Sequence, residues 1–394
     1  MQRLSQSPTA PDFVQDPYRF YARARATGDL FWWEEYGMLA AASHRAVNLV
    51  LRDRRFGREI PPECAVTPES RLTPFYDIEA HSMLELEPPR HTRLRGLVVR
   101  AFTSGRVRAL APDIEALCEN LISTFPEGPF DLLAAYATPL PVIIIARLLG
   151  IDPARAPELL AWSNAMVGMY QAGRSRRDED AAITASIAFR AFLEAEIAKK
   201  SARPDDGLLS GLIATHSDDG HLSRDELVAT AILLLNAGHE ATVHSLGNMV
   251  RTLLLTGRTG SALTDAARQP GMVDEALRFD PPLHLFTRYA YEDMDVFGTP
   301  VARGDKVAAL LASANRDETV WTDAATFDPA RKALPHSSFG AGLHFCVGAP
   351  LARLELDIAL RTLAQKCPTL KLAETPHYAD IYHFHGLDRL MVTI

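Results

Sequence analysis

Apolar residues recur at helical spacing along most of this chain, and alternating patterns are confined to short stretches. The longest helical pattern opens with the capping box Ser223-Arg224-Asp225-Glu226 and continues to Gly257 without a proline. At about 1.5 Å per residue, this helix is on the order of 50 Å long. Alternation between Arg288 and Val307, and again from Tyr378 to Ile394, predicts short hairpins. We therefore expect a mainly α fold with small β-sheets.

One glycine-rich segment carries the most specific chemical signal. It reads Phe339-Gly340-Ala341-Gly342-Leu343-His344-Phe345-Cys346-Val347-Gly348 and runs into a helical pattern near Pro350. Glycines at 340 and 342 allow sharp turns and close approach to a flat ligand. The N–H groups of Gly348 and of the helix start point back at the sulfur and moderate the charge of a thiolate. Cys346 is a candidate axial ligand of haem iron, and the alternative is a buried free cysteine.

The segment resembles the haem-binding signature of the cytochrome P-450 family, which reads Phe, two residues, Gly, one residue, His or Arg, one residue, Cys, one residue, Gly. Every fixed position matches. The resemblance covers nearly the whole chain and implies the family's triangular, mostly helical fold with small β-sheets. It also implies a single haem-thiolate monooxygenase domain over residues 1–394, with heme b as cofactor and Cys346 as the iron ligand.

A second anchor of the resemblance is Glu275-Ala276-Leu277-Arg278, on a helical pattern that stops at Pro281-Pro282. An acid and a guanidinium three residues apart share one helix face and can pair bidentately. The family buries this pair with a second arginine as a structural cluster. Arg331 occupies the place of that second arginine.

A third anchor lies in the middle of the long helix, at residues 237–242, where the family relays protons to dioxygen through an acid and an alcohol. The resemblance makes Glu240, Ala241 and Thr242 the candidate catalytic positions. Ala241 stands where most members have the threonine, and Thr242 is turned about 100° around the helix. We expect Glu240 to deliver protons through ordered water, completed in part by a polar group of the substrate.

His239 and His244 flank this segment and resemble the zinc-protease pattern His-Glu-x-x-His. Their spacing is one residue too long, because five residues turn the second side chain about 140° away from the first. We therefore interpret both as ordinary helix residues.

The resemblance also implies which residues hold the haem and which line the pocket above it. A Leu/Ala stripe on a helix is more typical of a core than of a pocket. His284 and His385 are expected to add polar recognition of the substrate. The expected haem contacts are His91, Arg95, Arg288 and His344 at the propionates and Phe339, Gly340, Cys346 and Gly348 in the loop. The expected substrate contacts are Leu234, Ala237, Gly238, Leu283, His284, Leu285, Phe286 and His385.

The reaction implied is insertion of one oxygen atom of O2 into a C–H bond of a small, largely apolar organic molecule. Electrons would come from NAD(P)H through a reductase and an iron-sulfur ferredoxin. Arg100, Arg106, Arg108 and Arg353 flank the expected thiolate side, either as the ferredoxin surface or as an ordinary mixed-charge surface. Two other classes remain open: a peroxide-driven haem-thiolate enzyme, and a non-catalytic haem protein that binds a ligand or senses a gas.

Composition and charge narrow the possible class of protein further. The chain has 394 residues, 47% hydrophobic residues and a net charge of −8, which argues against nucleic-acid binding. Its four cysteines show no paired spacing, which is typical of a reducing compartment. The first residues are polar and no uninterrupted apolar span occurs. We expect a cytoplasmic monomer without a membrane anchor.

Overall fold

The computed structural model describes residues 2–171, 173–215, 220–332, 335–382 and 384–394. Helices account for most of the ordered elements, as the periodicity predicts. The α-helices are α1 Pro11–Gln15, α2 Tyr18–Thr27, α3 His44–Arg52, α4 Thr73–Glu79, α5 Arg90–Ala101, α6 Ser104–Ala109, α7 Ala111–Ser123, α8 Pro139–Leu149, α9 Ala156–Val167, α10 Arg176–Ala202, α11 Leu208–Ala214, α12 Arg224–Leu255, α13 Ser261–Ala267, α14 Met272–Phe279, α15 Leu311–Ala314 and α16 Ala349–Lys366. The short helical segments are η1 Pro62–Cys64, η2 Ser70–Leu72, η3 Leu133–Ala137, η4 Pro153–Arg155, η5 Gly168–Tyr170 and η6 Gly342–His344.

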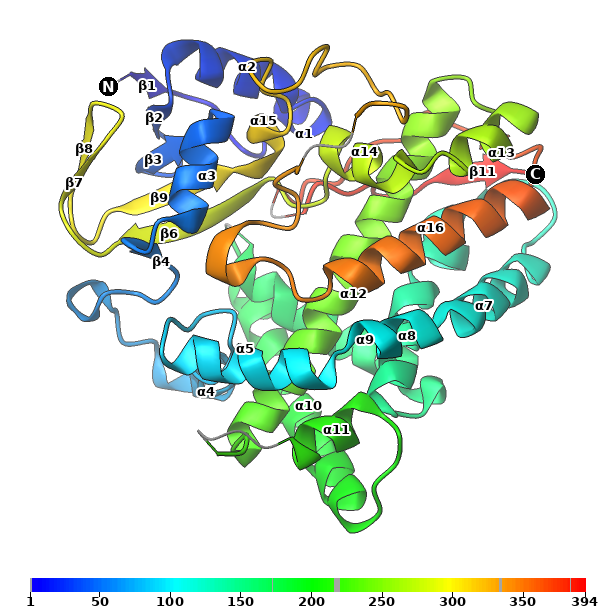
Figure 1. Ribbon diagram of the computed structural model, residues 1–394, viewed down its shortest axis with the longest axis horizontal. Coiled ribbons are helices and arrows are strands. Elements are labelled where there is room, and N and C mark those ends of the chain that lie inside the picture. The colour runs from blue at the N-terminus through cyan, green and yellow to red at the C-terminus, as the bar shows by residue number, and fades with distance from the viewer. Residues whose placement is uncertain (1, 172, 216–219, 333–334, 383) are drawn as a thin grey trace.

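The largest sheet gathers on one side of the molecule, together with the N-terminal helices (Figure 1). Its strand order is β1-β2-β3-β9-β6-β4, with β9 parallel to β3 and antiparallel to β6. A three-stranded sheet of order β10-β11-β5 and a hairpin of β7 with β8 complete the β portion. The strands are β1 Arg3–Leu4, β2 Leu30–Trp33, β3 Met38–Ala41, β4 Phe56–Gly57, β5 Phe130–Asp131, β6 Leu285–Ala290, β7 Met294–Val296, β8 Thr299–Val301, β9 Lys306–Leu310, β10 Lys371–Leu372 and β11 Met391–Thr393.

The two alternating stretches behave differently. Residues 288–307 form the expected antiparallel pairing, because β6 pairs with β9 and the β7–β8 hairpin lies between them. The short hairpin expected at 378–394 is confirmed only in part, because its first residues make one antiparallel bridge and Ala379 N–H donates to Gly386 O at 2.9 Å. Its last residues form β11, which pairs with β10 and β5, while Tyr378 makes only an isolated bridge to Leu387. Residue 383 of that stretch lies outside the described residues.

Helix α12 crosses the middle of the molecule and is packed by helices from both halves of the chain (Figure 1). Its capping box is present: Ser223 accepts from the N–H of Glu226, and Glu226 accepts from the N–H of Ser223. Most of its residues are buried because α8, α9, α14 and α16 surround it. Within the described residues, no helix combines the length and apolarity needed to cross a bilayer.

Candidate functional site

The glycine-rich loop before α16 is held in a conformation that needs its glycines. Gly340 and Gly342 both have φ of 69°, in the left-handed region. A Cβ on Gly342 would collide with the carbonyl of Leu51. The N–H of Cys346 donates to the carbonyl of Phe339 at 3.0 Å, which closes the loop. The expected turns at positions 340 and 342 are confirmed.

The thiol of Cys346 lies at the start of α16. Burial raises its pKa, while the N–H groups of Gly348 and Ala349 and the charges of Arg95 and Arg353 act in the opposite direction. Those donors and cations favour the anionic sulfur, and a metal ion at the sulfur would add to them. The sulfur is therefore arranged to serve as a thiolate ligand.

Helix α5 brings two expected haem contacts to this loop. Arg95 donates to the carbonyl of Phe345 at 2.6 Å, and the ring of His91 lies 4.3 Å from that of His344 between centroids. Burial, together with the charges of His344 and Arg95, lowers the pKa of His91 to about 4. Burial likewise lowers the pKa of Arg288 to about 10. The structure thus brings the predicted propionate ligands to one side of the loop.

Two residues that sequence reasoning did not single out complete this cluster. Glu87 lies 2.9 Å from His344 Nε2 and also accepts the backbone N–H of Arg58 at 2.7 Å. The side chain of Arg58 pairs with Glu85 at 2.5 Å. Glu87 could have been noticed because it lies one helical turn before His91, whereas no local pattern marks Arg58.

The cluster leaves polar atoms that a haem would satisfy. Nδ1 of His91 and Nε of Arg58 are buried without a hydrogen-bond partner. Arg288 is 2% exposed, and its hydrogen bond goes to its own neighbour, Thr287 O, at 2.8 Å. Buried cations and donors are normally paired. Two propionates would supply the missing acceptors, so the residues fit a haem.

The Glu-x-x-Arg cluster is present and buried. Glu275 and Arg278 are 5% and 1% exposed, and two hydrogen bonds of 2.7 Å join them. Arg331 Nε adds a third contact to Glu275 at 3.3 Å. Arg278 also donates to the carbonyls of Asn315 and Ala324, each at 2.9 Å. The network ties α14 to the chain that leads into the haem loop.

The acidic residue in the middle of α12 lies between two histidines. Glu240 Oε1 is 3.5 Å from His239 Nε2, and Oε2 is 3.3 Å from His244 Nε2. Burial acts to raise the pKa of Glu240, but the two imidazoles lower it below its ordinary range. The amide of Asn164, turned with its nitrogen inward, donates to Glu240 at 2.7 Å. Interpreting these histidines as ordinary helix residues missed both contacts.

The neighbouring alcohol is turned into its own helix. Thr242 is 6% exposed, and its hydroxyl contacts the carbonyl of Gly238 at 3.4 Å. Ala241 supplies no hydroxyl. Glu240 is half-buried, and its carboxylate has a polar partner on each side.

The expected substrate contacts divide into two groups. Ala237 is exposed and Gly238 and Ala241 are half-buried, although the turns of α12 on either side are buried. Leu283, Leu285 and Phe286 are likewise half-buried, and Leu283 and Phe286 pack against the cluster that contains Ala341 of the haem loop. Leu234 is 7% exposed, so it lies in the core.

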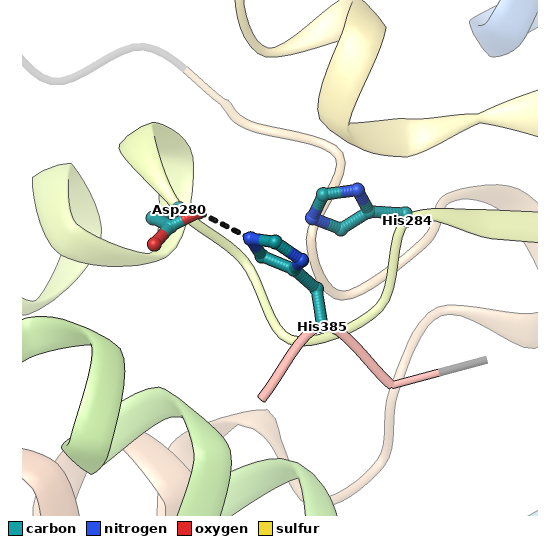
Figure 2. Close-up of side chains that lie close together, drawn as sticks. All are labelled: Asp280, His284 and His385. Carbon is teal, nitrogen blue, oxygen red and sulfur yellow. Dashed lines mark ion pairs between the residues drawn. The ribbon is translucent and has the colours of Figure 1, made fainter. Parts of the chain in front are cut away.

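The second group does not face open space. His284 is 0% exposed and His385 is 5% exposed, and they lie beside Asp280 (Figure 2). Burial lowers the pKa of His284 well below its ordinary value. The expected contact of these two imidazoles with substrate gains no support from this arrangement, because neither reaches a surface.

Comparisons with known proteins agree with this geometry. The family described as "Cytochrome P450" matches residues 270–381. Cytochrome P450 monooxygenase PikC of Streptomyces venezuelae is 37% identical over 384 residues, covering 93% of this chain and 87% of that protein. Vitamin D(3) 25-hydroxylase of Pseudonocardia autotrophica is 38% identical over 319 residues, covering 79% and 77%.

Solved structures give the same result over the whole fold. The structure of P450BioI with a hexadec-9Z-enoic acid ligated acyl carrier protein has a TM-score of 0.90 at 29% identity, covering 97% of this chain and 100% of that chain. The structure of CalO2 has a TM-score of 0.90 at 28% identity, covering 99% and 98%. The chain therefore belongs to the cytochrome P450 family of haem-thiolate monooxygenases.

Proposed function

We propose that this haem-thiolate monooxygenase oxidises a small, largely apolar organic substrate, and we assign roles to the residues of its site. The observation that carries the proposal is the sulfur of the half-buried Cys346, which the N–H groups of Gly348 and Ala349 face. Cys346 is the iron ligand, and Phe339, Gly340 and Gly348 shape its loop. The orphaned atoms of His91 and Arg58 support a haem site bounded by His91, Arg95, Arg288 and His344. When bound, the haem with its thiolate supplies dioxygen activation for insertion of one oxygen atom into a C–H bond.

Proton delivery is assigned to Glu240. Its carboxylate is partly exposed, and it is held by His239 and His244, so it can pass a proton between ordered water and the oxygen site without leaving its position. Ala241 leaves room for water or for a polar group of the substrate in place of a hydroxyl. Thr242 takes a minor part, because its hydroxyl is turned to Gly238.

The substrate site is assigned to the exposed face of α12 and the start of β6. Ala237 and Ala241 lie one helical turn apart on the less buried side of α12, Gly238 lies beside them against Ile145, and Leu283, Leu285 and Phe286 supply apolar surface next to the haem loop. An apolar lining suits an unactivated C–H bond, because it excludes bulk water from the oxygen site. Residues 1–394 form one domain in this proposal, supported by a core cluster that runs from Val14 to Val392.

Electron supply is assigned to an iron-sulfur ferredoxin and its NAD(P)H-dependent reductase. Arg100 and Arg108 are exposed, and Arg106 and Arg353 are half-buried. Phe345, 40% exposed beside the cysteine, gives this surface an apolar centre. A basic rim around an apolar centre suits an acidic redox protein.

The decisive experiment compares two ways of running the reaction. Compounds are first screened for a shift of the haem Soret band, and those that bind are incubated with NADH, ferredoxin and reductase. Product that depends on all three components supports the proposal. Product with peroxide alone would favour a peroxygenase, and tight ligand binding without product in either case would favour a sensor.

The docking surface is tested in the same assay by charge reversal. Arg100→Glu should raise the ferredoxin concentration needed for half-maximal turnover and weaken its salt dependence. Arg203→Glu, an exposed cation in the loop after α10, is the matched control and should leave the ferredoxin dependence unchanged. Equal effects of both variants would show that Arg100 is not part of the ferredoxin surface.

A further inference from the structure

A second polar cluster lies where the chain leaves α14 and where the C-terminal segment returns before β11. Asp280, His284 and His385 each direct one ligand atom inward, and these atoms lie within 4.8 Å of one another. Figure 2 shows the imidazole of His385 between the other two side chains. All three are at least nine-tenths buried. Among the described residues, these three are the His, Cys, Asp or Glu side chains whose ligand atoms lie close enough together to hold one metal ion.

The cluster contains nitrogen atoms that the protein leaves unsatisfied. Nε2 of His284 and Nε2 of His385 are both buried without a hydrogen-bond partner. The second of these is 3.4 Å from Asp280 Oδ1, close enough for an ion pair but not aligned as a hydrogen bond. Two orphaned imidazole nitrogens in one buried place are unusual, since buried polar atoms normally find partners.

Tyrosine hydroxyls hold two of the three side chains, His284 and Asp280, and Tyr18 bonds the same oxygen of Asp280 that faces His385. Tyr21 hydroxyl lies 2.9 Å from His284 Nδ1, which leaves Nε2 as the inward-facing atom. Tyr18 donates to Asp280 Oδ1 at 2.7 Å, and Tyr378 donates to Oδ2. Metal ligands are characteristically oriented by such outer hydrogen bonds.

The two backbone segments that carry the ligands are also fixed to each other. Asn248 of α12 donates its amide N–H groups to the carbonyl of His385 at 2.9 Å and to that of Asp280 at 3.3 Å. The N–H of His385 donates to Pro282 O at 2.7 Å. The ligand atoms are therefore brought together by the fold, before any ion is considered.

We propose that Asp280, His284 and His385 bind a divalent transition-metal ion of the zinc class, at a site distinct from the haem iron. Two imidazoles and one carboxylate are a donor set that Zn²⁺ and its first-row neighbours accept. With bonds of about 2.0–2.2 Å, the donor atoms of such an ion lie roughly 3–3.5 Å apart, which matches the 3.4 Å between His385 and Asp280. The ion would cross-link the chain after α14 to the C-terminal segment.

The test measures metal uptake by the untagged holoenzyme. Protein produced with added zinc is dialysed against metal-free buffer, and zinc and iron are counted by mass spectrometry. We expect about one zinc per haem, and X-ray absorption at the zinc edge should give N/O neighbours at about 2.0–2.1 Å without sulfur. Adding EDTA should lower the thermal midpoint, and adding ZnCl2 should restore it.

Variants separate this site from surface binding. His385→Gln and His284→Leu should lose the zinc, while His377→Ala, at an exposed histidine nearby, should keep it. Tyr21→Phe removes the hydroxyl that bonds both His284 and Tyr382 and should weaken zinc binding about tenfold. Haem content and the ferrous carbonyl spectrum report whether each variant folds. Folded wild-type protein that takes up no zinc, or zinc retained in both histidine variants, would overturn the proposal in favour of a metal-free polar network.

Discussion

His244 Nε2 lies 3.3 Å from Glu240 Oε2, one helical turn further along α12, and this contact defines the environment of the acid. The other nitrogen of His244 is buried and unpartnered, and it faces Gly386, where a Cβ would collide with the ring. The glycine therefore allows the C-terminal segment to close over the imidazole. His239 holds the other carboxylate oxygen at 3.5 Å. Glu240 is thereby kept ionised in a position where it can exchange protons with water.

Replacing either member of this pair should impair proton delivery in a graded way. Glu240→Gln should lower product formation by roughly 10²-fold or more, because it removes an acid–base group. His244→Asn should have a smaller effect and should raise the pKa of Glu240. Activity would then be lost at a higher pH on the acid side. The measurement is product per NADH between about pH 4 and about pH 8, a range that includes the ordinary glutamate pKa of about 4.3, with Ser245→Ala on the same turn as control. An unchanged pH profile in His244→Asn would remove its role.

Restoring or removing the alcohol should discriminate between two proton routes. We expect Thr242→Ala to couple electrons to product nearly as well as the wild type, because the hydroxyl is turned toward Gly238 O. Ala241→Thr should improve coupling for apolar surrogate substrates, since it supplies a hydroxyl in the usual place. Product and peroxide are measured per NADH consumed. Loss of coupling in Thr242→Ala alone would instead establish a threonine relay.

Cys346→His should abolish the thiolate-type ferrous carbonyl spectrum and the monooxygenase activity. Cys118 and Cys367 are buried and Cys64 is exposed, and none of them lies in a glycine-rich loop. Serine or alanine at these positions should leave the spectrum intact, so each serves as a matched control. Survival of the thiolate spectrum in Cys346→His would show that another residue is the ligand.

Glu275→Ala should prevent accumulation of folded holoprotein. The substitution strands the buried guanidinium of Arg278 and removes a contact of the half-buried Arg331, and loss of one partner in such a network costs roughly 3–5 kcal/mol. Soluble haem-loaded protein and the midpoint of urea unfolding are measured. Glu318→Ala, at a carboxylate that is 66% exposed, should be close to neutral. Stable, haem-loaded Glu275→Ala with altered kinetics alone would contradict a structural role.

The contact between α4 and η5 should loosen as the pH rises. Tyr170 donates to Glu79 at 2.6 Å, and burial raises the pKa of Glu79 to about 7. Since the ordinary glutamate pKa is about 4.3, burial in the folded state favours the protonated acid, although the hydrogen bond from Tyr170 acts in the opposite direction. The contribution of the protonated acid to stability is complete below about pH 4 and is lost as the pH rises through about 7. Hydrogen exchange of residues 168–170, corrected for intrinsic rates, should be faster at about pH 8 than at about pH 6. Glu79→Gln should remove the difference, and equal protection in the wild type would refute it.

The sequence by itself determined the parts of this protein that depend on local spacing. Three such patterns each lie within one loop or one helix: the glycines around a cysteine, an acid and an arginine three residues apart, and a capping box before a proline-free run. The structure bears out the geometry expected for each: φ of 69° at Gly340 and Gly342, the buried Glu275–Arg278 pair, and α12 beginning at Arg224.

Only the tertiary structure decided which distant side chains meet. The pairing of β11 with β5, the contact of Glu87 with His344, and the cluster of Asp280 with His385 join segments that are more than 100 residues apart. Even the contact of His244 with Glu240, which has ordinary helical spacing, depends on burial of the His244 ring by the C-terminal segment. Pair energies of this kind depend on desolvation and on neighbours from other elements, and no local sequence pattern records either.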